Sequence, residues 1–509
     1  MPAANVLYIT VDQWRGDCLG VAGHPVVRTP TIDALAARGV RFANHWSVTA
    51  PCGPSRASLH TGLYLMNHRS VNNGTPLDDR FTNIAREARA HGYDPTLFGY
   101  TDTSVDPRTV DDPDDPRLRD YEGLLPGFAA GTILTWHTMD PWLAWLEGHG
   151  HRLPATWEEL FEPIPDYPGA EDHGSTWAPS RFPAEHTETA FLTERVIEWL
   201  DRRDDEPWFA HVSYVRPHPP YRAPEGYHDL YDPDDGPAFR RLADRDAELA
   251  MHPIHAAGAH LTKAPVDERE MRQLRASYWG NMTEVDDQLA RLFGHLDELG
   301  LADDTLVVLT ADHGDQMGDH WLVEKLGWWD ESYHVPLIVV DPRPEADATR
   351  GTAVDAFTES VDVMPTLCTW IGAEVPIAVD GRELQPFLHE GAMPDDWRTE
   401  AHWQWDFRDP VDHVAEDIFG VTMEQCSLDV IRTADHKYVH LGTGDCLSFD
   451  LTEDPDQLVD RSVDPDAAEA IADARGRLLS WRMRHDDRTL AGTRLTAEHG
   501  LVVRRDPRR

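Results

Sequence analysis

The sequence predicts an α/β protein with a mostly parallel central sheet sandwiched by helices, followed by a smaller C-terminal α+β domain. Two observations predict this fold class. Apolar runs of strand length alternate with helical patterns up to about residue 380, and beyond it short strand-like segments precede a single helix. Strands that alternate with helices are typical of a parallel sheet buried on both faces.

Five apolar runs bounded by turn residues are predicted as buried strands: Val6–Val11, Thr96–Tyr100, Trp208–Tyr214, Thr305–Thr310 and Val335–Val340. The helical patterns between them cover Ile32–Arg38, Asn83–His91, Thr187–Arg203 and Glu268–Leu299. Gly39, Gly92 and Gly300 close three of these patterns, as expected for the glycine that commonly ends a helix.

The pattern changes around Asp380-Gly381, which divides the chain into a predicted large domain at residues 1–380 and a smaller domain at 381–509 with an oligomerising tail. The smaller domain is predicted to contain strands Leu428–Arg432, Lys437–His440 and Leu447–Leu451 and a helix from about Pro465 to Arg484. Residues 102–120 and 224–263 are rich in Pro and Asp, and we expect long loops there, over the site or at a subunit contact.

The composition predicts a globular protein that binds neither nucleic acid nor membrane. Apolar residues make up 41% of the chain, and no apolar stretch approaches the roughly 20 residues that span a bilayer. The 90 acidic and 46 basic residues give a formal charge of −44, which repels the phosphates of nucleic acids and acidic lipids. An anionic substrate would therefore require a local cluster of Arg, Lys, His and metal.

Two features favour a cytoplasmic location. The N-terminus enters a strand-like run at Asn5 without the basic stretch or cleavage site of a signal peptide. The five cysteines have no metal-finger spacing and are too few for a disulfide framework in a chain of this length.

Polar clusters follow three of the predicted strands: Asp12-Gln13, Arg216-Pro217-His218-Pro219-Pro220 and Asp312-His313-Gly314-Asp315. Because ligands of such sheets bind beyond the carboxyl ends of the strands, we expect these clusters to meet at one site. Asp12, Gln13, Asp312 and His313 form a hard, mostly oxygen ligand set that suits Mn²⁺ or Ca²⁺, and less well Mg²⁺, rather than Zn²⁺. Taken singly, Asp12 could be a helix cap and His313 a surface loop residue.

The run Cys52-Gly53-Pro54-Ser55-Arg56 resembles the Cys-x-Pro-Ser-Arg signature of the sulfatases, and it stands in the sulfatase order between the two acidic clusters. The alternative is a structural cysteine at the start of a helix. Further runs, Gly62 to Arg69, Gly99-Tyr100-Thr101 and Asp406-Phe407-Arg408-Asp409, resemble bacterial phosphonate monoester hydrolases and related arylsulfatases.

This resemblance implies the alkaline-phosphatase-like fold, one divalent metal ion, and a formylglycine-generating enzyme that oxidises Cys52. The hydrated aldehyde then supplies a metal-bound hydroxyl that attacks the ester, so Cys52 is also a predicted metal ligand. Arg56, one helical turn away, is expected to orient the diol, while Lys325 and His218 supply charge and a proton to the leaving oxygen. Asn73 and Tyr100 are expected to bind the substrate. The alternatives for Lys325 and His218 are an ordinary surface lysine and a loop residue.

Two departures from these relatives bear on substrate and assembly. Asp102 stands where phosphonate monoester hydrolases offer a threonine-rich turn, so its carboxylate would disfavour dianionic substrates or accept a proton from the diol. The segment His252–Val266 looks shorter than the hairpin that commonly builds their tetramers, which favours a homodimer, with a tetramer as the alternative.

The predicted function is hydrolysis of small anionic esters: sulfate monoesters first, with promiscuity toward phosphonate monoesters and phosphodiesters. The alternatives are a dedicated phosphonate monoester hydrolase with the same nucleophile, a phosphodiesterase or phosphotransferase that keeps the Cys52 thiol, and a catalytically silent anion-binding protein. Trp328, Trp329, Trp403 and Trp405 could line an aryl-binding pocket or belong to the core.

Overall fold

The computed structural model describes residues 5–135, 138–156, 158–203 and 206–503, and its central feature is an eight-stranded sheet. The strands lie in the order β5 (Ala129–Ile133), β4 (Thr96–Gly99), β6 (Phe209–Tyr214), β1 (Asn5–Val11), β7 (Thr305–Ala311), β8 (Leu337–Val340), β2 (Val40–Phe42) and β9 (Thr352–Val354). Strand β8 is antiparallel to both of its neighbours, and the remaining pairs are parallel. The prediction of a mostly parallel sheet is therefore confirmed.

Helices cover both faces of this sheet, as the buried strands require. Alternate residues of β1 point to opposite faces: Leu7, Ile9 and Val11 pack in one core cluster, and Val6 and Tyr8 in the other. The first face is covered by α1 (Pro30–Arg38), α6 (Glu188–Leu200) and the long α9 (Glu268–Glu298), and the second by α2 (Cys52–Thr61), α4 (Ile84–Ala90) and α11 (Val363–Trp370).

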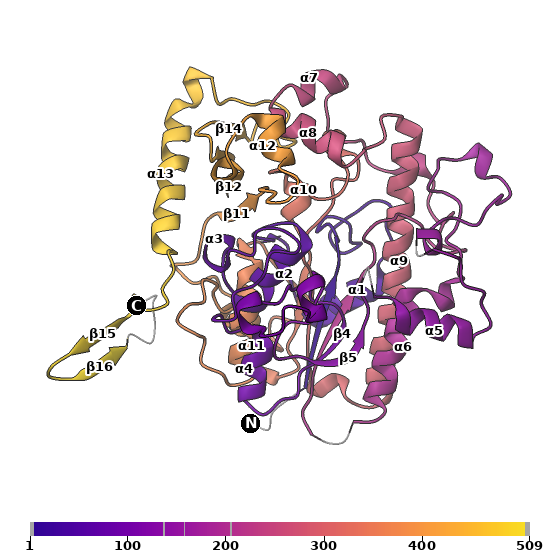
Figure 1. Ribbon diagram of the computed structural model, residues 1–509, viewed down its shortest axis with the longest axis horizontal. Helices are drawn as coiled ribbons and strands as arrows, with labels where there is room; N and C mark the ends of the chain where they lie inside the picture. Colours follow the sequence, from indigo (N-terminus) through magenta and orange to yellow (C-terminus); the bar gives the residue numbers. More distant parts are fainter. Residues whose placement is uncertain (1–4, 136–137, 157, 204–205, 504–509) are drawn as a thin grey trace.

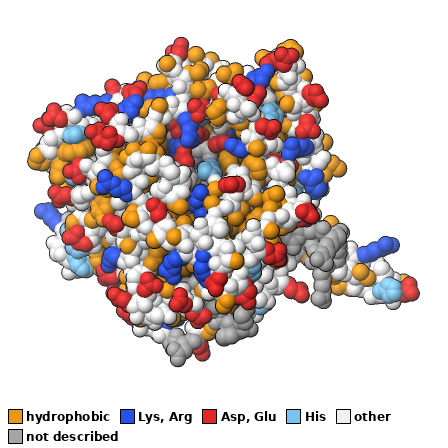
Figure 2. Space-filling model, turned by 180° about the vertical axis from the view of Figure 1, so that it is seen from behind, with side chains coloured by type: hydrophobic (Ala, Val, Ile, Leu, Met, Phe, Trp, Pro, Cys, Tyr) orange, Lys and Arg blue, Asp and Glu red, His pale blue; other side chains and the backbone are white. Residues whose placement is uncertain are grey.

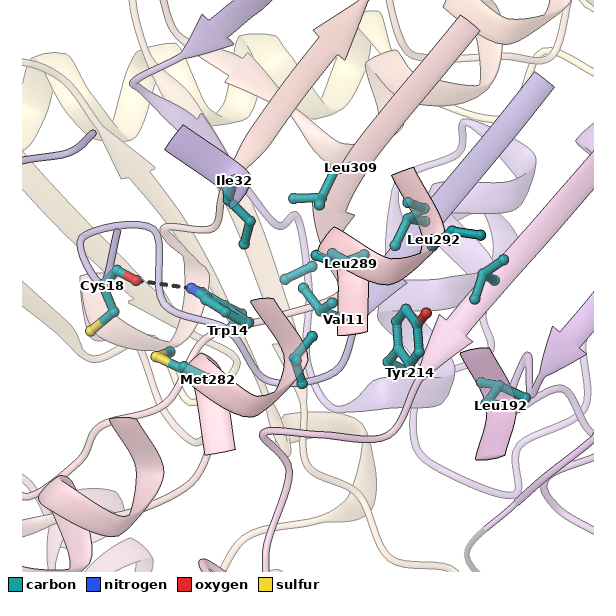
Figure 3. Close-up of a cluster of buried hydrophobic side chains, with 14 of the residues drawn as sticks. Val11, Trp14, Cys18, Ile32, Leu192, Tyr214, Met282, Leu289, Leu292 and Leu309 are labelled. Carbon is teal, nitrogen blue, oxygen red and sulfur yellow. Dashed lines mark hydrogen bonds between the residues drawn. The ribbon is translucent and has the colours of Figure 1, made fainter. Parts of the chain in front are cut away.

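Figure 3 shows the packing on the first face. Met282, Leu289 and Leu292 of α9 lie against Val11 and Leu309 at the centre of the sheet. The Trp14 indole closes this cluster next to the end of β1 and donates a hydrogen bond of 3.1 Å to the carbonyl oxygen of Cys18. The core thus fixes the chain on either side of Asp12 and Gln13, which follow β1.

The smaller unit is an antiparallel sheet of β11 (Ala401–Asp406), β12 (Ser427–Arg432), β13 (His436–Leu441) and β14 (Cys446–Asp450). One face packs on α13 (Ala468–Arg484) through Ile471, Leu478 and Trp481, and the other packs on the large domain, where Trp403 stacks on Trp46. The three predicted strands and the helix of this domain are confirmed, whereas β11 was not predicted. The boundary at residue 380 stays a prediction.

The expectation of loops at residues 224–263 is wrong in part. This segment contains α7 (Arg245–Leu249) and α8 (Pro253–Leu261), so the stretch His252–Val266 is largely helical and is no hairpin. A hairpin of β15 (Thr493–Thr496) and β16 (Gly500–Val503) instead projects from the body near the C-terminus (Figure 1). The segment 102–120 is a loop with two short 3₁₀ turns, as predicted.

Charge distribution and helix composition can be described for the visible face and the described residues. On the face seen in Figure 2, the acidic and basic side chains drawn in colour are interspersed, and the basic ones form no broad patch there. Among the described residues, no helix has both the length and the apolar character that crossing a membrane requires. All five cysteines lie in the described part of the chain and are unpaired.

Candidate functional site

The three polar clusters meet at one edge of the central sheet. They follow β1, β6 and β7, and β1 pairs in parallel with both of the others, so their carboxyl ends lie side by side. The backbone amide of Gln13 donates to Asp312 Oδ1 at 3.0 Å, which links the ends of β1 and β7 directly. The predicted convergence of the clusters is confirmed.

Cys52 opens α2, whose ten residues are all buried and which ends at Gly62 in the left-handed conformation with a φ of 69°. The Cys52 Sγ lies 3.2 Å from His313 Nε2 and 4.0 Å from Asp12 Oδ1. Ser55, one turn along the helix, donates to the Asp312 carbonyl oxygen at 2.5 Å. The signature segment therefore presents Cys52 to the two strand ends from the N-terminus of a helix, where backbone N–H groups favour anions.

Arg56 is fully buried and lies between the two carboxylates. Its Nε donates to Asp312 Oδ2 at 3.0 Å and its Nη2 to Asp12 Oδ2 at 3.1 Å. Its Nη1 donates to the Tyr100 carbonyl oxygen and to Ser213 Oγ, at 3.1 and 2.7 Å. Burial alone would raise the pKa of Asp12, but Arg56 first, together with Lys325 and the Tyr100 hydroxyl, holds that pKa below its ordinary value. Arg56 therefore helps to keep Asp12 ionised and binds both carboxylates, and its predicted role toward the diol stays a prediction.

Four side chains form a group able to hold a metal ion. One ligand atom from each of Asp12, Cys52, Asp312 and His313 can be chosen so that all four lie within 4.8 Å of one another, and all four residues are buried. His313 Nδ1 is 3.0 Å from the Gly314 carbonyl oxygen, an acceptor, so in the neutral ring Nδ1 carries the proton and Nε2 its lone pair. Two carboxylates and an imidazole aimed at one buried point fit a divalent cation.

Gln13, the remaining predicted metal ligand, is bound by Lys325. The Lys325 Nζ donates to Gln13 Oε1 at 2.6 Å, and the Gln13 amide donates to Asp315 Oδ2 and to the Tyr221 hydroxyl. Burial alone would lower the pKa of Lys325, but the acidic groups around it raise it above its ordinary value: an ionised Cys52 would contribute most, and the carboxylates of Glu324 and Asp12 follow. Lys325 is thus a buried cation beside the predicted metal ligands, and no surface lysine.

His218 lies on the turn after β6, which Arg216 holds in place. Arg216 donates to the carbonyl oxygens of His218 and Pro220, at 2.9 and 2.8 Å, and to Glu188 Oε1 at 2.6 Å. The His218 Nδ1 is 2.8 Å from the Pro219 carbonyl oxygen. Burial, assisted by Lys325, lowers the pKa of His218 well below its ordinary value, so the ring is neutral at pH 7. Lys325, and not His218, therefore carries the available proton in the resting site.

The predicted substrate-binding residues surround the start of α2. Asn73 Oδ1 accepts a hydrogen bond of 2.9 Å from the Gly53 amide, and the Tyr100 hydroxyl donates to Asp12 Oδ2. A Cβ at Gly53 would come within 3.2 Å of the Asp102 carbonyl oxygen and 3.4 Å of its carboxylate, so Asp102 lies directly against the signature segment. Burial raises the pKa of Asp102 to about 8, against the opposing pull of Arg56. Its carboxyl group is therefore mostly protonated at pH 7.

Several residues that contact the site were not predicted from the sequence. Asp315 and Tyr221 hold the Gln13 amide, Ser213 holds Arg56, and Glu188 holds Arg216. Ser213 had a detectable signal, because it is a polar residue, like His211, in the fully buried strand β6. Asp315 belongs to the Asp-His-Gly-Asp run that marked the site. Glu188 opens α6, far from the three polar clusters in the sequence, and had no such signal.

Three of the four tryptophans proposed for an aryl-binding pocket belong to the core. Trp328, Trp329 and Trp403 are at most 1% exposed and pack between the large domain and the small sheet. Trp405 is the exception: it is half-buried and lines a pocket next to Pro51.

Two family models together match most of the chain. A family model described as "Sulfatase" matches residues 4–373, and a second, described as "N-sulphoglucosamine sulphohydrolase, C-terminal", matches residues 318–484. The chain is 42% identical to the multifunctional alkaline phosphatase superfamily protein PehA of Trinickia caryophylli, over 99% of this chain and all of that one. It is 28% identical to an arylsulfatase of Clostridium perfringens, over 89% of each chain.

Two solved structures of phosphonate monoester hydrolases are similar to the chain over nearly its whole length. The phosphonate monoester hydrolase of Agrobacterium radiobacter superposes with a TM-score of 0.93 at 45% identity, covering 98% of this chain and 99% of the other. The phosphonate monoester hydrolase SpPMH of Silicibacter pomeroyi superposes with a TM-score of 0.93 at 38% identity, covering 99% of both chains. The alkaline-phosphatase-like fold expected from the sequence is confirmed.

Proposed function

Because the chain belongs to the sulfatase family and is a hydrolase of sulfate or phosphonate esters, we propose that it hydrolyses small monoanionic esters through a formylglycine made from Cys52. Sulfate monoesters are the proposed first substrates, with phosphonate monoesters and phosphodiesters also turned over. The observation that carries the proposal is the position of Cys52, at the N-terminus of α2 and 3.2 Å from His313 Nε2, within a buried group of two carboxylates.

The proposed cofactor is one divalent ion, Mn²⁺ or Ca²⁺ before Mg²⁺. Asp12, Asp312, His313 and residue 52 would hold it, and the Gln13 amide oxygen could join them by turning away from Lys325. The bound ion would supply positive charge that polarises the ester and favours the ionised form of the attacking hydroxyl.

The remaining roles follow from the charges of the side chains. Arg56 fixes the carboxylates of Asp12 and Asp312 in place. Lys325, charged and buried, can neutralise the ester anion and donate a proton to the leaving oxygen. His218 is neutral and Nδ1 faces a carbonyl oxygen, so its Nε2 can donate only after the ring gains a proton near a bound anion. Asn73, by holding the Gly53 amide, orients the first turn of α2.

The thiol alternative receives little support from the site. Burial, and then the Asp12 carboxylate, raises the pKa of the Cys52 thiol well above its ordinary value. The thiol is therefore protonated at neutral pH and is a weak nucleophile. The maturation signature around Cys52 is complete, which instead supports oxidation by a formylglycine-generating enzyme.

A dedicated phosphonate monoester hydrolase with the same nucleophile is the second candidate. It is favoured by the similarity to two phosphonate monoester hydrolases over nearly the whole chain. Values of kcat/KM for an aryl sulfate, an aryl phosphonate and an aryl phosphodiester with the same phenol distinguish the two. A phosphonate value that exceeds the sulfate value by more than tenfold would make it the main activity.

Mass measurement of the tryptic peptide 42–56 tests the nucleophile directly. We expect an aldehyde or its hydrate at residue 52, which does not react with a thiol-alkylating reagent. Cys52→Ala and Cys52→Ser should both lose at least about 10³-fold in kcat, because neither forms the diol. Cys446→Ser, at a half-exposed cysteine outside the site, is the matched control. Wild-type turnover by Cys52→Ala would refute the proposal.

Two further proposals concern assembly and location. The β15–β16 hairpin exposes Leu495 by 80% and Leu501 by 62%, which supports its assignment as the oligomerising tail of a homodimer, with a tetramer as the alternative. Deletion of residues 490–509 should then give a monomer in light scattering, and an unchanged mass would refute the assignment.

The unpaired state of all five cysteines supports the cytoplasm as the compartment.

A further inference from the structure

A half-open apolar pocket lies beside the candidate site. Its volume is about 250 Å³. Three of its lining residues are the sequence neighbours of site residues: Pro51 beside Cys52, Asn72 beside Asn73, and Leu326 beside Lys325. The pocket therefore adjoins the segments that carry Cys52, Asn73 and Lys325.

The outer wall of the pocket comes from parts of the chain that are distant in sequence. Helix α8 contributes Ile254 and Leu261, the segment after β11 contributes Phe407, and α12 (Val414–Phe419) contributes Ile418 and Phe419. The Phe407 ring packs edge-on against Phe419 with centroids 6.1 Å apart, and Trp405 lies 4.8 Å from Phe407. Leu261 and Ile418 at the rim are 53% and 48% exposed. Such exposed apolar side chains around a concave surface mark a ligand site.

The pocket offers few polar partners to an occupant. Asp409 is the one charged residue among its lining residues. Hydrogen bonds from the amides of Asp412 and Val411 lower the pKa of Asp409, which keeps it ionised. A sugar would leave most of its hydroxyl groups unpaired here, and a second anionic group on the ligand would meet the Asp409 carboxylate.

We propose that this pocket is the leaving-group subsite and that it selects esters of uncharged, apolar alcohols, aryl groups above all, over sulfated sugars. The proposal rests on the proposed ester hydrolysis at residue 52. A cavity of 150 Å³ lined by Leu, Ile and Phe holds a benzene ring, so the pocket has room for a substituted phenyl group. Its specificity-determining residues are Leu261, Ile418, Phe419 and Asp409.

Phenyl sulfates with 4-methyl, 4-ethyl and 4-propyl groups test the proposal, because alkyl groups extend the apolar surface and barely change the acidity of the phenol. We expect kcat/KM to rise about two- to fourfold per added methylene, the range between half and full burial of a CH₂. In the Leu261→Ser/Ile418→Ser double variant the rise should fall below about 1.5-fold. Val411→Ser is the matched control, since Val411 is 79% exposed next to α12 and does not line the pocket.

A second arm tests the charge at the rim. Asp409→Asn should raise kcat/KM for 4-carboxyphenyl sulfate about threefold relative to phenyl sulfate, as expected for one screened charge contact. A flat alkyl series in the unmutated enzyme, or the same slope in the double variant, would overturn the subsite. Absence of turnover for every sulfate and phosphonate ester would instead refute the proposed function, so the two failures are distinguishable.

Discussion

Arg56 and Asp312 form a fully buried ion pair of 3.0 Å, and the same guanidinium donates to Asp12 at 3.1 Å. One cation thus neutralises part of the charge of two carboxylates that would otherwise repel each other in a low-dielectric setting. Arg56 therefore reduces the repulsion between Asp12 and Asp312.

The first prediction concerns this triad. Arg56→Met should lower the free energy of unfolding by about 3 kcal/mol in EDTA, because it leaves two buried carboxylates without their partner. Added Mn²⁺ should restore part of the loss, since the ion replaces the missing charge. Urea denaturation with and without metal measures both effects. Arg117→Met, which removes an exposed partner of Asp115, is the control and should have no measurable effect. Equal stability of Arg56→Met and wild type in EDTA would contradict this account.

The second prediction concerns metal removal. Dialysis against a chelator should abolish ester hydrolysis, and Mn²⁺ or Ca²⁺ should restore it better than Mg²⁺. Asp312→Asn should reduce the bound metal per chain to below about a tenth, because a neutral amide is a much weaker ligand of a hard cation. Elemental analysis of the purified protein provides the count. Full activity in protein shown to be metal-free would exclude the proposed cofactor.

The third prediction concerns Asp102 and substrate charge. A sulfate monoester carries one negative charge, whereas a phosphate monoester, with a second pKa near 6, carries about two above pH 7. Because burial raises the pKa of Asp102 to about 8, its carboxyl group repels the dianion little at pH 7 and more strongly at pH 9. The ratio of kcat/KM for an aryl sulfate to that for the matching phosphate should therefore exceed one and rise severalfold from pH 7 to 9.

Asp102→Thr and Asp102→Asn should remove this rise, mainly by improving the phosphate at high pH. The structure changes the argument made from the sequence, which took Asp102 as ionised throughout. If the ratio does not change between pH 7 and 9 in the wild type, the carboxyl group does not act on the substrate.

The sequence predicted the parts of the site that depend on order along the chain. Asp12, His218 and His313 follow three strands, and parallel pairing brings the ends of such strands together whatever the details of packing. The sequence did not predict that Arg56 faces the carboxylates. The guanidinium donates hydrogen bonds to groups on or just after β1, β4, β6 and β7, which are far apart in the sequence. The pKa of Asp102 depends on burial, which no local pattern reveals.

The same limit applies to the apolar pocket. Trp328, Trp329 and Trp403 were equal candidates for it with Trp405, because composition cannot separate a core indole from one at a pocket wall. Helix α8 falls in a segment rich in Pro and Asp that suggested a loop, and its apolar face becomes meaningful only beside α12 and Leu326. Gln13 and Asp102 adopt positive φ angles of 67° and 51°, a conformation that the residue types do not predict.

The last prediction concerns the pH dependence of stability. His320 is fully buried between two acidic residues: its Nδ1 is 3.1 Å from Glu248 Oε1 and its Nε2 is 3.5 Å from Glu331 Oε2. Burial alone would lower the pKa of His320, but these carboxylates raise it from 6.5 to about 9. Because the folded pKa is the higher one, the charged ring stabilises the fold fully below pH 6.5, and this stabilisation is lost as the pH rises through about 9.

His320→Gln should therefore lower the free energy of unfolding by roughly 2 kcal/mol at pH 6.5, and the difference from wild type should shrink toward pH 10. Urea denaturation at pH 6.5, 8 and 10 measures this trend. His260→Gln, at an exposed histidine of α8, is the control and should follow the wild type at each pH. A His320→Gln deficit that stays constant from pH 6.5 to 10 would mean that the ring contributes by its packing on Trp329, 3.7 Å away between centroids, and not by its charge.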